Sequence, residues 1–293
     1  MEGKLTEQSA IITGGNQGLG LAIAKAFVQE GANICICARN KQQLVVAVDE
    51  LKTLRISDKQ QIISLAIDVS IPAEVESLIQ QAIKKFKQVH ILVNNAGIYG
   101  PMGPIDTVDW EQWKKTIEIN LYGSVLPCRM LLPHFRQHKY GKIIQISGGG
   151  ATNPMPQIEA YAASKSAVVR TMESIAQECI ADNITVNCVA PGLLNTRLLD
   201  EVLANGPERA GEQFYQQMLK AKETNKTTSF DFATELCIFL ASKASNGITG
   251  RLISAVWDNY YAWPDHIEEL QQSDLYTLRR ITGRERSITW GDK

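Results

Sequence analysis

The sequence predicts an α/β protein in which helices cover both faces of one doubly wound parallel sheet, giving three layers in a single domain. Three observations support this fold class. Short β-branched segments alternate with helix-length amphipathic segments, as parallel strands with crossover helices require. The strands are apolar almost throughout, as expected of strands buried on both faces. No Pro/Gly/Ser-rich linker, repeat or low-complexity segment divides the 293 residues.

The expected strands are short runs rich in Val, Ile, Leu and Cys. They cover residues 9–13, 33–38, 62–67, 91–94, 142–147, 185–190 and 251–254. The helices expected between them carry apolar residues at helical spacing. They cover residues 18–30, 42–54, 72–86, 110–135, 160–179 and 232–240. Pro72 suits the first turn of its helix, where a missing N–H costs nothing. Residues 5–255 therefore form one expected doubly wound unit.

The composition is that of an ordinary soluble globular protein. Apolar residues make up 44% and charged residues 21%, and 30 Lys and Arg stand against 31 Asp and Glu, a net charge of −1. This excludes disordered and collagen-like classes and gives no electrostatic reason to expect nucleic acid or a membrane surface as a partner. The apolar runs are too short to span a bilayer, and residues 1–9 lack the apolar segment of a secretory signal. We therefore expect a cytoplasmic protein.

The cysteines and histidines show no metal-ligand spacing. Six cysteines are scattered without a C-x-x-C motif, and Cys35 and Cys37 lie in an apolar strand as small buried hydrophobes. His134 and His138 share a helix face, but Pro133 and polar neighbours favour a helix end at the surface. No metal is expected.

A glycine-rich loop follows the first strand. Residues 13–20 read Thr-Gly-Gly-Asn-Gln-Gly-Leu-Gly and lead directly into a helix. Glycines let the backbone turn sharply and approach a ligand, and free N–H groups at a helix start bind a pyrophosphate. The spacing T-G-x-x-x-G-x-G differs from the G-x-G-x-x-G of the broad dinucleotide fingerprint. Alone, this loop is a weak signal of a dinucleotide site.

Further motifs follow the later strands. They are Asp68-Val69, Asn94-Asn95-Ala96-Gly97, Asn120 within a long helix, Ser147, Tyr161-Ala-Ala-Ser-Lys165, and Pro191-Gly192 with Leu194 and Thr196 beyond. With this set, residues 5–255 closely resemble the classical short-chain dehydrogenase/reductase family, which has a Rossmann-type sheet. The resemblance implies an NAD(P)-dependent oxidoreductase that interconverts a secondary alcohol and a carbonyl.

The resemblance implies a catalytic set of Asn120, Ser147, Tyr161 and Lys165. On a helix, Tyr161 and Lys165 lie one turn apart on one face. A phenol has a pKa of about 10, and a nearby ammonium would lower it so that Tyr161 acts as general acid/base. The resemblance further implies that Lys165 binds the nicotinamide ribose and that Ser147 polarises the carbonyl. Asn120 would kink its helix and anchor a water that links Lys165 to solvent.

The resemblance also implies cofactor contacts from the loops at the strand ends. They are Gly14, Asn16, Gln17, Gly18, Leu19, Gly20, Arg39, Asp68, Val69, Asn95, Ala96, Gly97, Tyr161, Lys165, Pro191, Gly192, Leu194 and Thr196. The end of the second strand meets the adenosine ribose, where an acid selects NAD and a basic residue accommodates the 2′-phosphate of NADP. This chain has Ala38-Arg39-Asn40 there, with no carboxylate, which favours NADP. If Arg39 only stacks on the adenine, NAD stays open.

The chain departs from the family pattern at two places. Thirteen residues separate Ser147 and Tyr161 instead of the common twelve, and Gly148-Gly149-Gly150 can absorb the extra one. The pocket wall from Gly149 to Pro156 is therefore expected to be reshaped. The Gly-Gly pair that often follows the last strand is replaced by Ala255-Val256-Trp257-Asp258.

Substrate specificity in the family comes from three segments. Here they are residues 100–104, 149–156 and a lid at about 193–230, in which Gly206 and Gly211 are candidate hinges. The partner is a small carbonyl or alcohol, but these segments do not distinguish a sugar, a polyol, an acyl thioester or a steroid.

Residues 1–256 form the expected dinucleotide-binding domain with its lid, and residues 257–293 form a C-terminal extension outside the resemblance. The extension is rich in aromatic residues, which rarely cluster without packing on a surface. We expect residues 257–278 to fold back on the domain or a neighbouring subunit, near the lid, and to help close the pocket. The resemblance further implies a homo-oligomer, a tetramer before a dimer.

Two other functions fit the sequence less well. A cofactor-binding regulatory or assembly protein without catalysis would account for the extension and the missing Gly-Gly pair, but the retained catalytic set counts against it. A nucleotide-sugar epimerase or dehydratase is less favoured, because the chain is shorter than the extended relatives.

Overall fold

The computed structural model describes residues 3–288 and 290, and these contain one seven-stranded sheet in the order β3-β2-β1-β4-β5-β6-β7. Every strand pairing is parallel. The strands are β1 Ser9–Thr13, β2 Asn33–Ala38, β3 Ile62–Ala66, β4 Ile91–Asn94, β5 Gly141–Ile146, β6 Ile184–Ala190 and β7 Leu252–Ser254. The chain runs outward from β1 to β3 and then returns to place β4 on the other side of β1, so the sheet is doubly wound. The predicted fold class is confirmed.

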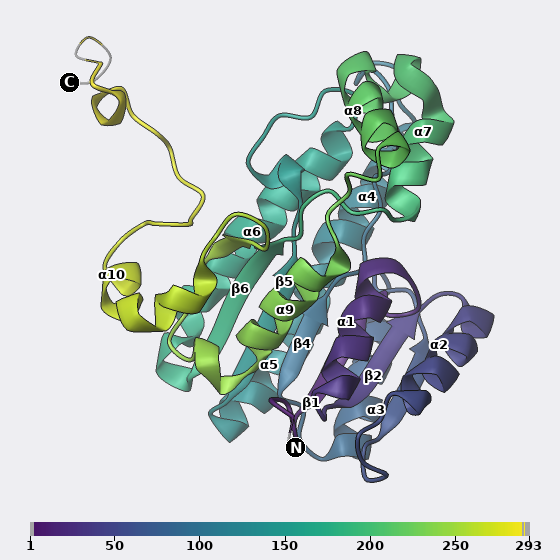
Figure 1. The fold of residues 1–293 in the computed structure, drawn as a ribbon, viewed down its shortest axis with the longest axis vertical. Coiled ribbons are helices and arrows are strands. Elements are labelled where there is room, and N and C mark those ends of the chain that lie inside the picture. Colours follow the sequence, from purple (N-terminus) through teal and green to yellow (C-terminus); the bar gives the residue numbers. More distant parts are fainter. Residues whose placement is uncertain (1–2, 289, 291–293) are drawn as a thin grey trace.

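Helices cover both faces of the sheet (Figure 1). One buried cluster lies under α1, α2 and α9, and the other lies under α3, α5 and α6. These helices are α1 Gly18–Gln29, α2 Lys41–Thr53, α3 Pro72–Phe86, α5 Gly123–His138, α6 Glu159–Cys179 and α9 Phe230–Ala241. Neighbouring strand residues divide between the clusters, with Ile12 in the first and Ile11 in the second, because successive side chains point to opposite faces. Cys35 and Cys37 are buried together in the second, as expected.

The helix expected over residues 110–135 is interrupted. α4 Trp110–Ile117 runs into a π-helical turn, Glu118–Tyr122, before α5 begins. The turn has Asn120 at its centre, where the sequence predicts a kink. Such turns are rare and reorient the side chains that follow.

Two helices form the lid at the carboxyl end of the sheet, α7 Arg197–Ala210 and α8 Glu212–Glu223 (Figure 1). Gly206, with φ of 72°, breaks α7, and Gly211, with φ of 84°, separates the two helices. Both positions are left-handed backbone that favours glycine. The two expected hinges are therefore the places where the lid bends.

The C-terminal extension lies along α9 and the outer edge of β7. It contains a 3₁₀ segment, Tyr260–His266, and α10 Ile267–Gln271. Tyr260 and Trp263 are buried in the first core cluster, and the Tyr260 ring centroid lies 5.2 Å from that of Phe239 on α9. The N–H of Leu252 donates to the carbonyl oxygen of Tyr276 at 2.8 Å, so the extension covers the sheet edge.

The extension differs from the expected placement beside the lid. Ser254 N–H donates to Asp258 Oδ2 at 2.7 Å, and Trp257 N–H donates to Ser254 Oγ at 3.2 Å. These bonds reverse the chain directly after β7 and carry it down along α9. Among the aromatic residues that the structure describes in the extension, Trp257 alone lines the large cavity described below. Residues 279–288 extend away from the body of the domain (Figure 1).

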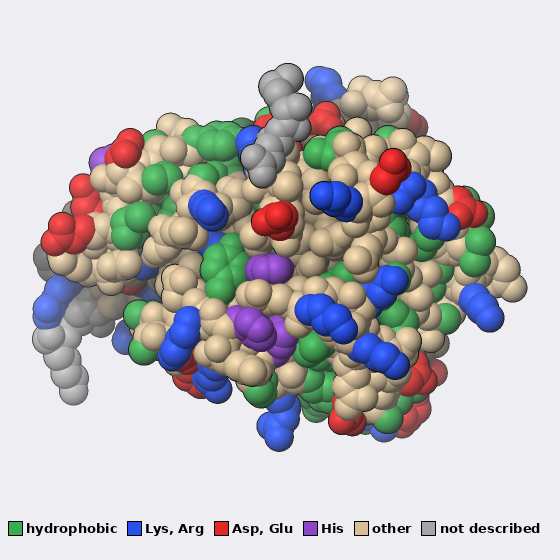
Figure 2. Space-filling model, turned by 90° about the horizontal axis from the view of Figure 1, so that it is seen from below, with side chains coloured by type: hydrophobic (Ala, Val, Ile, Leu, Met, Phe, Trp, Pro, Cys, Tyr) green, Lys and Arg blue, Asp and Glu red, His purple; other side chains and the backbone are tan. Residues whose placement is uncertain are grey.

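Three histidines gather at the opposite end of the sheet from the lid, and Figure 2 shows them from below. His90 Nδ1 accepts a hydrogen bond from Ser9 N–H, and His134 Nε2 accepts one from Val89 N–H, each at 3.1 Å. The accepting nitrogen of each ring therefore carries no proton. Burial, with a smaller effect from the nearby His134 and His138, lowers the pKa of His90 to about 4.

Candidate active site

One large cavity of about 1420 Å³ opens at the carboxyl ends of the strands. Its lining comes from the carboxyl ends of the seven described strands and the loops that follow them, and from the lid helices. A cavity for one drug-sized ligand measures roughly 300–1,000 Å³. This cavity therefore has room for a dinucleotide and a second molecule beside it.

The loop after β1 has the backbone of a phosphate-binding turn. Gly14 and Gly18 have φ of +64° and +54°, left-handed conformations that favour glycine. No side chain caps the start of α1, so its first N–H groups face the cavity as an anion site. Asn95 braces this loop, because its Nδ2 donates to the carbonyl oxygens of Thr13 and Gly14 at 3.0 and 3.1 Å. The geometry fits a pyrophosphate.

The end of β2 brings a cation to the far end of the cavity. Arg39 lines it, and none of the described residues forms an ion pair with this guanidinium. The carboxylates that line the cavity are Asp68 and Glu212, and neither belongs to the β2 loop. Burial raises the pKa of Asp68, but hydrogen bonds from Ser70 and the cations of Lys115 and Arg39 outweigh it, so the net change is downward.

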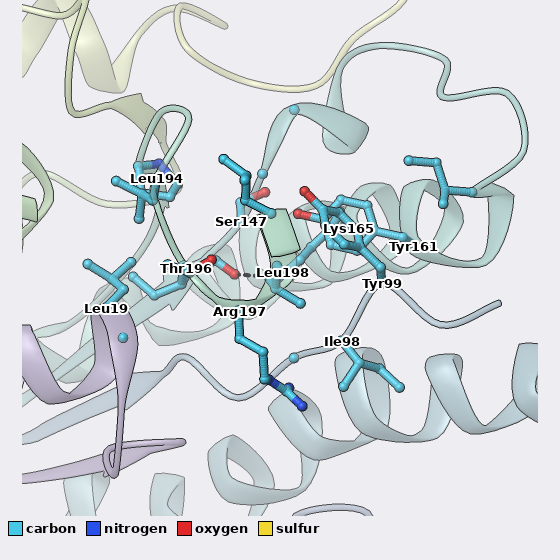
Figure 3. Close-up of a pocket in the computed structure, with 18 of the residues that line it drawn as sticks. Leu19, Ile98, Tyr99, Ser147, Tyr161, Lys165, Leu194, Thr196, Arg197 and Leu198 are labelled. Carbon is cyan, nitrogen blue, oxygen red and sulfur yellow. Dashed lines mark hydrogen bonds between the residues drawn. The ribbon is translucent and has the colours of Figure 1, made fainter. Parts of the chain in front are cut away.

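The catalytic candidates meet where β5 ends against α6. The Tyr161 and Lys165 side chains are buried, with Lys165 Nζ 5.6 Å from the centroid of the Tyr161 ring. Lys165 Nζ also donates to the carbonyl oxygen of Ile146 at 2.9 Å. The Ser147 Oγ is buried and has no hydrogen-bond partner among the described residues. Figure 3 shows the Ser147 and Tyr161 hydroxyl groups in the same part of the cavity.

The pKa of Tyr161 moves in the direction opposite to the expected one. Burial raises the pKa of this phenol above its usual 10, and the neighbouring Tyr99 raises it further. Burial also lowers the pKa of Lys165 to about 8. The expected lowering of the Tyr161 pKa is wrong here because desolvation disfavours both charged groups. At neutral pH, Tyr161 therefore holds its proton and can donate it.

Asn120 does not line the cavity but connects three elements around it. Its Oδ1 accepts from Ile98 N–H, and its Nδ2 donates to the Ile98 carbonyl oxygen and to Ser164 Oγ, each at 2.9 Å. A Cβ on Gly97 would lie 3.3 Å from Asn120 Oδ1 and 3.7 Å from Lys165 Nζ. Asn120 thus ties the β4 loop and the π-helical turn to α6, beside the catalytic lysine.

Most of the predicted site residues lie together. Apart from Asn120 and Gly20, every catalytic and cofactor-binding candidate lines the cavity. Gly20 lies outside the lining: a Cβ there would lie 2.2 Å from the Gly14 carbonyl oxygen, so this glycine lets α1 pack against its own loop. The segment after Ser147 contains a 3₁₀ turn, Gly149–Ala151.

Two neighbours of Tyr161 were not predicted. The Tyr99 ring stands edge-on to the Tyr161 ring, with centroids 4.6 Å apart. A Cβ on Gly148 would lie 2.2 Å from the Tyr161 phenolic oxygen, so this oxygen lies against the Gly148 backbone. The signal for Tyr99 was its place two residues after the Asn94–Gly97 motif, whereas nothing in the sequence marks Gly148 among its glycine neighbours.

The described part of the chain lacks two features, a cluster of metal-ligating side chains and a membrane-spanning helix. It contains no group of three His, Cys, Asp or Glu side chains placed to hold a metal ion. None of its helices combines the length and the apolar character needed to cross a membrane.

Comparison with known proteins agrees with this geometry. A family profile described as short chain dehydrogenase matches residues 8–206. A short chain dehydrogenase of Pseudocercospora fijiensis is 30% identical over 262 residues, which cover 88% of this chain and 82% of that protein. Dehydrogenase/reductase SDR family member 4 of Caenorhabditis elegans is 30% identical over 252 residues, covering 86% and 93%.

Solved structures share the fold. The structure of a short-chain type dehydrogenase/reductase from Mycobacterium ulcerans superposes with a TM-score of 0.77 at 25% identity, over 87% of this chain and 89% of that one. Levodione reductase superposes with a TM-score of 0.78 at 23% identity, over 85% and 96%. The chain therefore belongs to the short-chain dehydrogenase/reductase family and is an NAD(P)-dependent oxidoreductase.

Proposed function

We propose that this chain interconverts a secondary alcohol and the matching carbonyl compound by hydride transfer, with NADP as cofactor and Tyr161 as general acid/base. One observation carries the proposal: the Ser147 and Tyr161 hydroxyls face the same part of the cavity, and the buried Ser147 Oγ has no partner in the described chain. A buried polar atom without a partner costs about 1–3 kcal/mol. A substrate oxygen between the two hydroxyls would satisfy Ser147.

Each hydroxyl has a distinct task. Ser147 Oγ–H donates a hydrogen bond to the substrate oxygen and holds it beside Tyr161. In reduction, the Tyr161 phenol gives its proton to that oxygen, and in oxidation it takes the proton back. Burial raises the pKa of Tyr161, so at neutral pH the phenol carries the proton that reduction needs. The nicotinamide, when bound, supplies or accepts the hydride.

Lys165 and Asn120 support this exchange. One N–H of the Lys165 ammonium is used by the Ile146 carbonyl oxygen, and two donors remain for the nicotinamide ribose and for a water. Asn120 acts as a positioning residue, because its amide oxygen accepts from Ile98 N–H and its amide nitrogen donates to the Ile98 carbonyl oxygen and to Ser164 Oγ. We propose that the irregular backbone of the π-helical turn around Asn120 provides the path by which protons pass to solvent.

Arg39 supports NADP over NAD. Its guanidinium reaches the cavity without an ion-pair partner among the described residues, and no carboxylate of the β2 loop is available to bind a ribose 2′-hydroxyl. A guanidinium pairs a phosphate with two parallel hydrogen bonds. The remaining lining residues of the predicted set complete the cofactor site.

The catalytic role is tested with Tyr161→Phe. We expect turnover to fall by at least about 1,000-fold, in the range of general acid/base catalysis, while NADPH binding stays within about two-fold. Tyr215→Phe is the matched control, because Tyr215 lies on the lid but outside the cavity lining. Unchanged turnover by Tyr161→Phe with any accepted substrate contradicts the role.

The cofactor preference is tested with Arg39→Ala. We expect NADPH binding to weaken by about 1.5–3 kcal/mol, the scale of a hydrogen bond to a charged group, with little change for NADH. Arg55→Ala, an exposed arginine just beyond α2 and outside the cavity, controls for lost surface charge. Equal losses for both cofactors would mean that Arg39 stacks on the adenine.

We also propose a homo-oligomer, a tetramer before a dimer, built through the helices around α4, α5 and α6. The exposed side chains of Trp110 and Tyr122 on this surface support the proposal, because large apolar groups at a surface favour association. A monomer in sedimentation at micromolar concentration contradicts it.

Six cysteines that are all buried and free fit a reducing compartment, and we propose the cytoplasm.

A further inference from the structure

We propose that the substrate is an uncharged ketone, or the matching alcohol, carried on a bulky apolar body. This inference rests on the function proposed above and names its substrate class. It comes from the part of the cavity that lies between the catalytic hydroxyls and the lid.

The lid presents an apolar surface to the catalytic tyrosine. Leu199 of α7 and Met218 of α8 are buried with Ile158 in a third hydrophobic cluster, and all three line the cavity. Tyr99 and Phe214 pack against the same cluster. A substrate that reaches Ser147 and Tyr161 must therefore lie against aliphatic and aromatic side chains. These contacts stabilise an apolar body, whereas burying the hydroxyls of a sugar or polyol against them costs free energy.

Aromatic rings connect the lid to Tyr161. The Tyr99 ring stands edge-on to the Tyr161 ring and also edge-on to the Phe214 ring, the latter with centroids 6.2 Å apart and planes at 87°. The series Tyr161, Tyr99 and Phe214 thus forms one wall from α6 to α8. Aromatic walls of this kind bind apolar and aromatic groups through large contact areas.

The charged groups of the cavity do not serve the substrate end. Arg197 forms an ion pair with Glu201 at 3.2 Å, and in Figure 3 its side chain extends away from Ser147 and Tyr161. Glu212 is exposed at the start of α8 and accepts a hydrogen bond from Gln216.

The other three charged lining residues are also accounted for. Lys165 donates to Ile146, and Arg39 and Asp68 lie at the ends of β2 and β3. A carboxylate or phosphate on the substrate would therefore be buried without a counter-ion from the described residues, which is costly. The substrate class is uncharged.

The first test is a substrate panel. Wild-type protein with NADPH is given an aryl ketone, a polyhydroxy ketone and a keto acid of similar size. We expect kcat/KM for the aryl ketone to exceed that of the other two by at least about 100-fold, or about 2.7 kcal/mol at 1.36 kcal/mol per factor of ten. Equal or better turnover of the polyhydroxy ketone or the keto acid overturns the substrate class and leaves the oxidoreductase function standing. No turnover of any of the three counts against the proposed function itself.

The second test changes the lid. Phe214→Ala should raise KM for the aryl ketone about ten-fold, equal to about 1.4 kcal/mol, with kcat within about three-fold and NADPH affinity unchanged. Phe214→Leu should fall between Phe214→Ala and the wild type, because it restores part of the apolar contact. Gln216→Ala, exposed on the same helix and outside the cavity lining, is the control. An unchanged KM in Phe214→Ala, with an unchanged melting temperature, contradicts the inference.

Discussion

Replacing Gly148 by alanine tests whether the position of the Tyr161 phenolic oxygen sets the rate. The Cβ of an alanine would lie 2.2 Å from that oxygen and 3.2 Å from the ring carbon that carries it. Gly148 has φ of 179°, an extended backbone that any residue adopts, so the conflict is with the side chain of Tyr161 alone. The phenolic oxygen must then move by about 1 Å, and a misplacement of that size costs on the order of 100-fold in rate.

We therefore expect Gly148→Ala to lower kcat about 100-fold, equivalent to about 2.7 kcal/mol of activation free energy. The assay is NADPH oxidation at saturating carbonyl substrate, with NADPH affinity and melting temperature measured in parallel. Gly149→Ala is the matched control, because a Cβ at that neighbouring glycine meets nothing within 4 Å. If Gly148→Ala keeps kcat within about three-fold of the wild type, the reasoning that ties Tyr161 to this contact is refuted.

Two predictions concern stability. The pKa of His90 in the folded protein, about 4, lies below its ordinary 6.5, so the neutral ring stabilises the fold above pH ~6.5 and this contribution is lost as the pH falls toward 4. Because solvent reaches part of the ring, we expect the free energy of unfolding to fall by about 1–2 kcal/mol over this pH range. A series of denaturant titrations at different pH values measures this loss, which should be smaller in His90→Gln. Trp263→Ala should cost about 2–4 kcal/mol, because this buried ring packs on Tyr276, whereas the 86% exposed Trp257 should tolerate alanine within about 0.5 kcal/mol. Equal losses in the two tryptophan variants would contradict the placement of the extension.

The strands and the position of the site could be predicted from sequence because their signals are local. β1, β2 and β4 begin and end where the apolar runs predict them. In a parallel sheet the loops at the carboxyl ends of the strands meet at one edge, so motifs that follow these strands converge. This explains why Arg39 and Ser147, which are far apart in sequence, line one cavity.

Other features depend on contacts between distant residues and could not be predicted. The break between α4 and α5 accompanies the bonds from Asn120 to Ile98, 22 residues earlier, while the apolar spacing continues through it. The extension leaves the lid because Asp258 accepts a hydrogen bond from Ser254 N–H and so reverses the chain directly after β7. The direction of the Tyr161 pKa shift depends on how deeply the ring is buried, and the four-residue spacing to Lys165 carries no information about burial.

The covered edge of β7 has a consequence for synthesis of the chain. The Leu252 N–H is bonded to the Tyr276 carbonyl oxygen, and the Arg251 guanidinium donates to the carbonyl oxygens of Leu270, Ser273 and Leu275. An open sheet edge is a template on which other chains add strands and aggregate. Because Tyr276 is made 24 residues after Leu252, the growing chain carries this edge open until the extension follows. Chains that end before Tyr276 are therefore expected to aggregate, whereas fusions placed after Lys293 leave the protected edge intact.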